Sequence, residues 1–208
     1  MSYRVCKFAS AILVLAISAV VQISPASAET VGFGSGWKSV NFRSIPKTVY
    51  SFGGDTLGIM APKSSSVIYK AIPESARAAT KASWNWSVQT TVPPTNLAKK
   101  GGDDRNIALY FVFTDAATAR REGKNPNIKS LLTKRSRQQS PGSFVPSPYF
   151  SGRGTSIVKR GAVTGAFSEN VDLAADYRRA FGEEHGVLVG LAVSSDSDDS
   201  GIVSQSSL

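Results

Sequence analysis

The sequence predicts an all-β protein, an antiparallel β-sandwich of jelly-roll type with one or two peripheral helices. One observation is a pair of apolar runs, one around Trp84 and Trp86 and one over residues 107–113. Each run is about as long as a buried strand and is rich in aromatic and β-branched residues. A second observation is that turn residues recur roughly every ten residues earlier in the chain, which is typical of sandwiches and barrels. We expect the two runs to be neighbouring, central strands.

Four short segments precede these runs, and each has the length of a strand. Turn residues separate them, including a Gly53-Gly54-Asp55 triplet. Because such residues adopt the conformations that tight turns need, we expect a hairpin at this triplet. The four predicted strands cover residues 37–42, 47–52, 56–60 and 67–72.

The first apolar run places Trp84, Trp86 and Val88 on one face of a strand, because side chains alternate between the two faces. We expect both tryptophans in the core, since rings of this size bury a large area. An exposed Trp86 would instead be a candidate for stacking on a ligand.

The pattern changes after the second run. Residues 116–122 and 128–135 have a helix-forming composition and are separated by a Gly and Pro break. Residues 136–155 are rich in Ser, Pro and Gly, so we expect a loop there. We interpret residues 116–155 as a long insertion at the rim of the sandwich.

The last part of the chain contains a predicted helix between strands. Residues 156–159 are a candidate for a short strand. Ser168 offers an N-cap for the helix, acidic residues follow where the helix dipole favours them, and Gly182 can end the helix. Residues 187–193 form the last strong strand, and residues 202–208 remain for a short, polar edge strand.

Residues 1–28 have the pattern of a secretory signal peptide. Arg4 and Lys7 precede an apolar stretch, and small residues form the cleavage site. We expect an exported protein, periplasmic or extracellular, with a flexible lead-in over residues 29–36 and one domain over residues 37–208. No later stretch has the roughly 20 apolar residues of a membrane span.

Net charge limits the classes of binding partner, and cysteine content limits the chemistry available to the mature chain. The formal net charge of +9 becomes +7 without residues 1–28. This moderate excess suits a polysaccharide or another anionic envelope component, and the scattered bases predict no nucleic-acid partner. The single cysteine, Cys6, lies in the predicted signal peptide, which excludes disulfides and cysteine catalysis in the mature chain. A solvated surface is our interpretation of the one basic cluster, Lys134, Arg135 and Arg137.

Zinc and serine-triad chemistry are disfavoured. His185 is the only histidine, and it lies in a Glu-Glu-His-Gly turn. Zinc sites combine several histidine and cysteine ligands, and the Gly-x-Ser-x-Gly elbow of many serine hydrolases is absent from the sequence. We therefore expect a protein without catalytic residues of these kinds.

Two acidic runs remain, one at Asp103 and Asp104 and one over residues 196–199. Aspartates in loops commonly cap backbone amides, and a pair at a suitable separation can hydrolyse glycosidic bonds. Calcium prefers oxygen ligands from flexible loops, although the EF-hand spacing is absent here. We favour capping, expect no cofactor other than calcium, and leave the catalytic pair open. The predicted calcium ligands are Asp196, Asp198 and Asp199.

Aromatic rings outside the predicted central strands offer a second kind of site. Trp37, Tyr149 and Phe150 can stack on sugar rings if they are exposed. Together with Asp103 and Asp104 they are the predicted ligand-binding residues. Trp37 can also begin a strand and pack inside, and that alternative stays open.

Four motifs follow one another along the chain: Trp-x-Trp in a strand, Asp-Asp before an apolar strand, Asp-Tyr-x-x-x-Phe-Gly at residues 176–182, and a strand leading into residues 195–200. In this order they resemble a bacterial family of secreted proteins of unknown function, over roughly residues 37–200. The resemblance implies a galactose-binding-like, jelly-roll sandwich of the kind found in carbohydrate-binding modules. It implies no catalytic residue. Where that family has an aromatic-rich strand after Phe113, this chain has a helix-forming segment instead.

Export, the β-rich pattern and the resemblance together predict a non-catalytic exported protein, with carbohydrate binding as its candidate role. Two alternatives stay open. One is an envelope glycan hydrolase that uses carboxylates of the two acidic runs. The other is an interaction or structural protein of the envelope, which would use its basic surface and residues 116–155 for contact.

Overall fold

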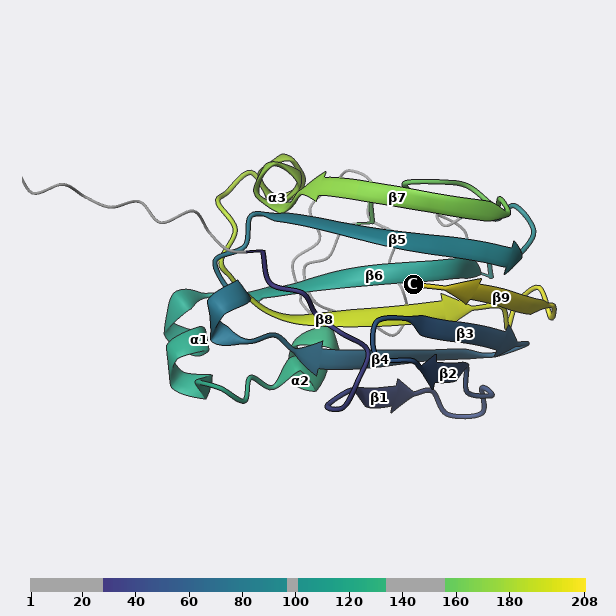
Figure 1. The fold of residues 1–208 in the computed structure, drawn as a ribbon, viewed down its shortest axis with the longest axis horizontal. Coiled ribbons are helices and arrows are strands. Elements are labelled where there is room, and N and C mark those ends of the chain that lie inside the picture. Colours follow the sequence, from purple (N-terminus) through teal and green to yellow (C-terminus); the bar gives the residue numbers. More distant parts are fainter. Residues whose placement is uncertain (1–27, 97–100, 134–155) are drawn as a thin grey trace, which may run out of the picture.

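The computed structural model describes residues 28–96, 101–133 and 156–208, which form two antiparallel β-sheets (Figure 1). The four-stranded sheet has the order β1 (Lys38–Asn41), β4 (Ser65–Ala71), β8 (Val187–Asp196) and β6 (Arg105–Thr114). The five-stranded sheet has the order β2 (Val49–Phe52), β3 (Leu57–Pro62), β9 (Val203–Ser207), β5 (Lys81–Thr90) and β7 (Gly165–Asp172). The predicted all-β, antiparallel sandwich is confirmed.

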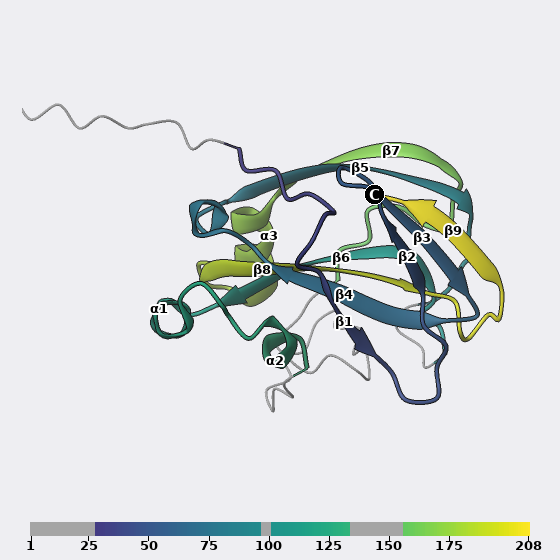
Figure 2. The ribbon, with the colours of Figure 1, turned by 60° about the horizontal axis from the view of Figure 1, so that its bottom comes forward.

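The two sheets stack face to face, as Figure 2 shows, and apolar side chains fill the space between them. Leu57 and Ile59 of β3 meet Val193 of β8 in one buried cluster. A second cluster brings Trp84 of β5 against Phe111 of β6, with ring centroids 6.1 Å apart. In β3, β5 and β6 the face that turns toward the other sheet is therefore the apolar one that the alternation predicts.

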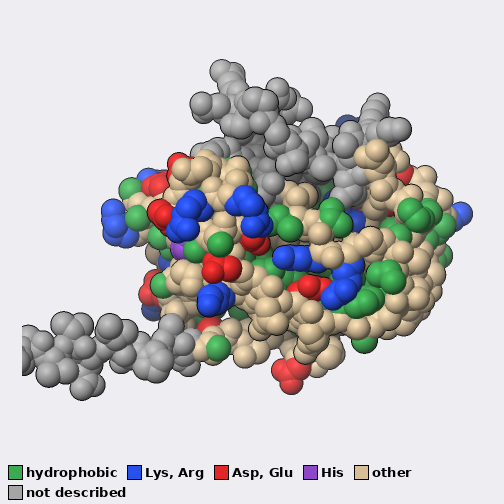
Figure 3. All heavy atoms as spheres, turned by 90° about the horizontal axis from the view of Figure 1, so that it is seen from above, with side chains coloured by type: hydrophobic (Ala, Val, Ile, Leu, Met, Phe, Trp, Pro, Cys, Tyr) green, Lys and Arg blue, Asp and Glu red, His purple; other side chains and the backbone are tan. Residues whose placement is uncertain are grey.

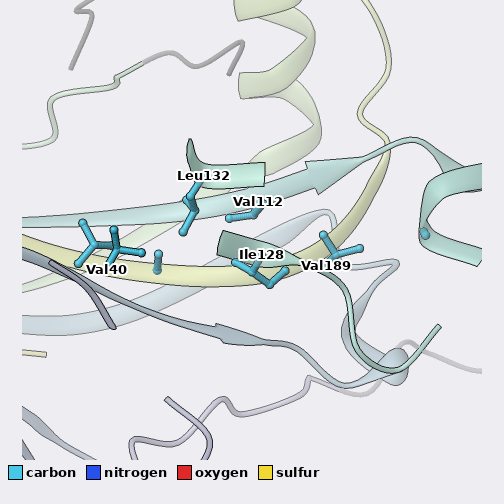
Figure 4. Close-up of a cluster of buried hydrophobic side chains, with 8 residues drawn as sticks. Val40, Val112, Ile128, Leu132 and Val189 are labelled. Atoms are coloured by element: carbon cyan, nitrogen blue, oxygen red, sulfur yellow. The ribbon is translucent and has the colours of Figure 1, made fainter. Parts of the chain in front are cut away.

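A third core lies on the other face of the four-stranded sheet, under α1 (Ala116–Glu122) and α2 (Ile128–Thr133). Figure 4 shows Ile128 and Leu132 of α2 beside Val112 and Val189 of the sheet. Gly190 makes this contact possible, because a Cβ there would lie 2.5 Å from Ile128 Cδ1. Both predicted helices are present, and their segment contributes side chains to the core. Full burial of a side chain such as Ile128 stabilises the fold by about 1.5–3 kcal/mol.

The two aromatic-rich runs are strands, but they are not neighbours in one sheet. β5 belongs to the five-stranded sheet, whereas β6 is the edge strand of the four-stranded sheet. The expectation of two adjacent central strands is therefore wrong for β6. The segment between β5 and β6 passes from the five-stranded sheet to the four-stranded sheet. The periodicity of residues within one strand does not indicate which sheet the next strand joins.

The segment before α3 (Leu173–Phe181) also differs from the prediction. Residues 165–172 form β7, so the helix begins later than Ser168, and Asp172 is its N-cap, accepting a hydrogen bond from the Ala175 amide. Gly182 ends the helix with φ of 72°, as predicted. The predicted strand at residues 156–159 is not formed. Cross-strand pairing with β5 outweighs the capping signal of Ser168 here.

The closing strand β9 is short and polar, as predicted, but it is not an edge strand. It lies between β3 and β5, and its side chains Ser204 and Ser206 are buried. Serine is tolerated there because both hydroxyls find acceptors on β6.

The chain before β1 contacts the sandwich. Val31 packs against the cluster around Leu173, and the Phe33 amide donates a hydrogen bond to the Gly54 carbonyl at the β2–β3 hairpin. The hairpin itself turns at the predicted triplet, where Gly54 has φ of 80°. A single 3-10 turn, η1 (Glu74–Ala76), links β4 to β5.

Several predictions fall outside the described residues. They concern residues 1–27 of the predicted signal peptide (residues 1–28), the basic cluster at 134–137 and the loop at 136–155. Within the described part of the chain, no helix has the length and apolar character needed to cross a membrane.

Candidate functional site

The two acidic runs meet at one rim of the sandwich, where β8 ends and β6 begins. Arg105, which follows Asp103 and Asp104, is the register partner of Asp196. One carboxylate oxygen from each of Asp104, Asp196 and Asp198 lies within 4.8 Å of the other two. Residues about 90 positions apart therefore form one cluster, which we call the acidic cluster.

Asp104 is 2% exposed and caps the turn after β8. Its two carboxylate oxygens accept hydrogen bonds from the backbone amides of Asp199, at 3.3 Å, and Ser200, at 2.7 Å. Amide donors satisfy a buried carboxylate and hold the turn in place. Capping, the role favoured from the sequence, is thus performed by the first acidic run on the second.

Asp196 is 4% exposed and is less well matched. Arg105 Nη2 lies 3.6 Å from its Oδ2, and Oδ1 has no hydrogen-bond partner among the described residues. Burial, and next the neighbouring Asp198, raise the pKa of Asp196 to about 8, although Arg105 opposes the shift. This carboxyl therefore favours a proton, or another positive partner, at neutral pH.

Asp199 lies on the side of the acidic cluster that faces solvent. Its side chain is exposed, and slight burial together with Asp103 raises its pKa to about 6. Asp198 and Asp104 add to that shift. Asp103 and Asp199 thus lie on the outer side of the same negative cluster, and Asp104 takes the position among the three closest carboxylates that the sequence suggested for Asp199.

Unpartnered polar atoms gather at the acidic cluster. Among the described residues, five buried side-chain nitrogen or oxygen atoms lack a hydrogen-bond partner, and four of them lie in or next to this cluster. Native proteins leave few buried polar groups unpaired, so such a concentration marks a place where a ligand or water belongs. The four atoms are Arg105 Nε, Ser195 Oγ, Asp196 Oδ1 and Ser200 Oγ.

Two neutral side chains at the same rim, Ser197 and Asn106, do have hydrogen-bond partners. Ser197 Oγ donates to the Ala61 carbonyl at 2.7 Å and accepts from the Ser64 amide at 3.3 Å. Asn106 Oδ1 accepts from the Val92 amide at 2.9 Å and from Ser204 Oγ at 3.1 Å. We call these contacts the neutral network; they tie β8 and β6 of one sheet to β3 and β9 of the other.

A second candidate surface is the outer face of the five-stranded sheet. On β5 and β7, the side chains on the face away from Trp84 and Val88 point outward. These side chains are uncharged apart from Lys81 and Asp172, which pair at one end. A hollow of about 280 Å³ lies between β5 and β7. The outward hydroxyl and amide side chains include Ser83, Asn85, Ser87, Ser168, Asn170 and Gln205.

An apolar spot flanks these polar side chains. Val49, Met60 and Val203 come from neighbouring strands β2, β3 and β9, and each is more than 40% exposed. Elsewhere the surface is mixed in charge: seen from the side of β7 and α3, basic and acidic side chains lie interspersed (Figure 3). The uncharged sheet face was missed from the sequence, although the alternation of Ser83, Asn85 and Ser87 between tryptophans in the same strand is a readable signal.

The predicted aromatic residues have different outcomes. Trp37 is half-buried, stacks on Phe33 with ring centroids 5.4 Å apart, and donates a hydrogen bond to the Gly32 carbonyl. Trp86 is half-buried, packs on Phe167 at 4.9 Å and donates to Glu169. Tyr149 and Phe150 lie outside the described residues.

His185 packs among aromatic rings, with Phe113 5.5 Å and Tyr177 6.4 Å from it between ring centroids. Its Nδ1 lies 2.7 Å from the Gly186 carbonyl. Both contacts belong to the packing of α3 onto the sandwich, which suits a structural residue in the turn after that helix.

Comparison with known proteins gives a family but no described relative. No curated protein and no solved structure gives a significant match to the chain. A family model matches residues 35–207, which is most of the chain and includes both sheets and the acidic cluster. The chain therefore belongs to the family described as protein of unknown function (DUF3047).

Proposed function

We propose that this protein is a non-catalytic binding module that acts outside the cytoplasm and presents the outer face of its five-stranded sheet to a neutral polysaccharide. The observation that carries the proposal is the composition of that face. Apart from Lys81 and Asp172 at one end, its exposed polar side chains are hydroxyls and amides, next to a small apolar spot.

Such a face matches the chemistry of a sugar polymer. Pyranose rings offer hydroxyl groups as hydrogen-bond partners and C–H faces that pack on apolar side chains. Uncharged polar groups cost less to remove from water than ionised ones, so an uncharged ligand can bind there without a counter-charge. The hollow between β5 and β7 can receive a sugar ring. It is lined by the hydroxyl and amide residues Ser83, Asn85, Ser168 and Asn170, and also by Trp84 and Glu169.

The hydrolase alternative is less well supported. The two acidic runs do converge, which a carboxylate pair requires. However, Asp104 is buried and already holds two backbone amides, and Asp196 is buried as well. Neither the hollow between β5 and β7 nor a second one of about 380 Å³ beside α1 is lined by an aspartate of the cluster. The burial of Asp104 and Asp196 leaves a glycosidic bond little room to reach their carboxyls.

Affinity electrophoresis through gels containing neutral or acidic polysaccharides tests the proposal. The double variant Asn85→Ala with Ser168→Ala removes a hydrogen-bonded pair from the face, in which Ser168 Oγ donates to Asn85 Oδ1 at 2.7 Å. We expect a neutral polysaccharide to retard the wild-type protein, with the same retardation at low and high salt. The double variant should bind roughly tenfold or more weakly, because two hydrogen bonds of about 1 kcal/mol are lost.

The matched control is Ser39→Ala with Asn41→Ala, an exposed Ser and Asn pair on β1 of the other sheet. It should bind as the wild-type protein does. Absence of retardation by every neutral polysaccharide contradicts the proposal. So does retardation by acidic polysaccharides alone that salt abolishes, since that result assigns binding to the scattered basic side chains.

A further inference from the structure

We propose that Asp104, Asp196 and Asp198 bind one calcium ion, which joins the end of β8 to the start of β6. This inference does not depend on polysaccharide binding. It concerns the acidic cluster at the rim, whereas the proposed function concerns the outer face of the five-stranded sheet.

The spacing of the carboxylates fits one ion. Calcium lies about 2.3–2.6 Å from each oxygen ligand, so oxygens that share an ion lie no farther apart than about 5 Å. The three oxygens from Asp104, Asp196 and Asp198 meet this limit, all lying within 4.8 Å of one another. They come from two chain segments, and an ion between them would bridge both.

The charge of the cluster calls for a cation. Five carboxyls, including Asp103 and Asp199, interact within it, and Arg105 is the one basic side chain that contacts them among the described residues. Burying several like charges without compensation is costly. A single guanidinium 3.6 Å from Asp196 carries too little positive charge to balance these carboxylates, and a divalent ion supplies the rest.

An independent observation points to the same place. Asp196 Oδ1 is buried and has no partner among the described residues, although its residue is only 4% exposed. Ser200 Oγ, on the turn that follows, is also buried and has no partner among the described residues. A buried carboxylate oxygen without a partner, on a residue that lies beside two further carboxylates, is the state expected of a metal ligand when its ion is absent.

Calcium suits the cluster better than magnesium. Magnesium usually takes one or two carboxylates and keeps most of its water, whereas calcium accepts six to eight oxygens in a flexible shell. Three carboxylates are close enough to share an ion, and the exposed Asp199 and the half-buried Asp103 lie beside them. Backbone oxygens of the turn and water can complete such a shell.

The ion would fasten the crossover between the sheets. Asp196 ends β8 in the four-stranded sheet, and the turn after it leads into β9 of the five-stranded sheet. Asp104 already holds this turn through two amides. A calcium ion bound only by the folded state would add stability through the same connection.

Thermal unfolding with and without calcium, together with calorimetric titration of calcium, tests the inference. At a hundredfold excess over the dissociation constant, calcium should raise the Tm of the wild-type protein by about 5–10 °C. Asp198→Asn removes the least buried of the three carboxylates. It should weaken calcium binding on the order of tenfold or more, since calcium affinity follows ligand charge.

The matched control is Asp55→Asn, an exposed aspartate in the β2–β3 hairpin, which should keep the wild-type response. No heat of binding and no Tm shift in the wild-type protein overturns the inference, as does an equal calcium response in Asp198→Asn. Tighter binding of magnesium than of calcium would overturn the assignment of the ion. None of these results depends on a polysaccharide being present.

Discussion

Two groups of buried polar side chains lie at one rim of the sandwich. They differ in how completely their polar atoms are paired with hydrogen-bond partners. The neutral network around Ser197 and Asn106 has a protein partner for each of its buried contacts. The acidic cluster has surplus negative charge, and four buried atoms in or beside it lack a partner. The same loops and strands supply both groups, so poor packing of the rim does not explain the difference.

The difference between the neutral network and the acidic cluster suggests a structural role for the first and a binding role for the second. A buried hydroxyl or amide can be satisfied by nearby backbone, and such groups fix one arrangement of loops. In the acidic cluster two backbone amides satisfy Asp104, whereas Asp196 keeps a buried oxygen without a partner among the described residues and lies beside further carboxylates. We therefore assign the neutral network to the fold, and we propose an ion only for the acidic cluster.

The largest expected effect is a dependence of stability on pH when calcium is absent. The folded-state pKa of Asp196, about 8, lies above its ordinary value of 3.8. Between these values the folded protein keeps a proton that the unfolded chain has lost, so stability falls as pH rises from about 4 to about 8, by several kcal/mol in all. Asp199, with a pKa of about 6, acts in the same direction.

The measurement is the Tm in chelator at several pH values across this window. Asp196 faces Asp198, Asp104 and Ser65, and also Arg105, whose guanidinium keeps its charge across this window. Calcium should flatten the decline because the ion replaces the proton, and Asp196→Asn should flatten it too. A Tm in chelator that stays level or rises from pH 5 to pH 8 would show that the cluster carries no such penalty.

The neutral network should be most sensitive at Asn106. Asn106→Ala leaves the Val92 amide and the Ser204 hydroxyl without their acceptor. Two buried unsatisfied groups cost about 2–5 kcal/mol together, which lowers the Tm by about 5–15 °C. The exposed Asn41 gives the control, and Asn41→Ala should change stability by less than about 0.5 kcal/mol. Equal melting of the two variants would remove the structural role of the network.

A smaller effect is expected from two serines of one turn. Ser197→Ala removes a donor to the Ala61 carbonyl and an acceptor for the Ser64 amide, at a cost of about 1–3 kcal/mol. Ser200→Ala removes a hydroxyl without a partner among the described residues, so it should cost less than about 0.5 kcal/mol. Chemical denaturation of both variants in chelator measures the difference. The reverse order of stabilities would contradict the contrast between matched and unmatched groups.

The sequence predicts the strands well where the signal is local. The hairpin at Gly54, the helix over residues 116–122 and the helix end at Gly182 follow from turn and capping chemistry, and all three are found. The placement of β6 at a sheet edge and of β9 inside a sheet was not predictable in this way. Sheet order depends on pairing between distant segments, which the period of one strand does not encode.

The site shows the same limit. Each acidic run is visible in the sequence, and calcium was a recognised alternative for residues 196–199. Asp104 could not be added to that set, because its approach to Asp196 depends on β6 pairing with β8. The outer face of the five-stranded sheet likewise emerges only when β5, β7 and β9 lie side by side.

The most direct test of this account is a crystal structure of the mature protein grown with calcium, with anomalous scattering used to identify the ion. The account predicts one calcium ion about 2.3–2.6 Å from carboxylate oxygens of Asp104, Asp196 and Asp198. A short hydrogen bond between the carboxyls of Asp196 and Asp198, with no ion at saturating calcium, would show that a proton neutralises the cluster. That result would contradict the account.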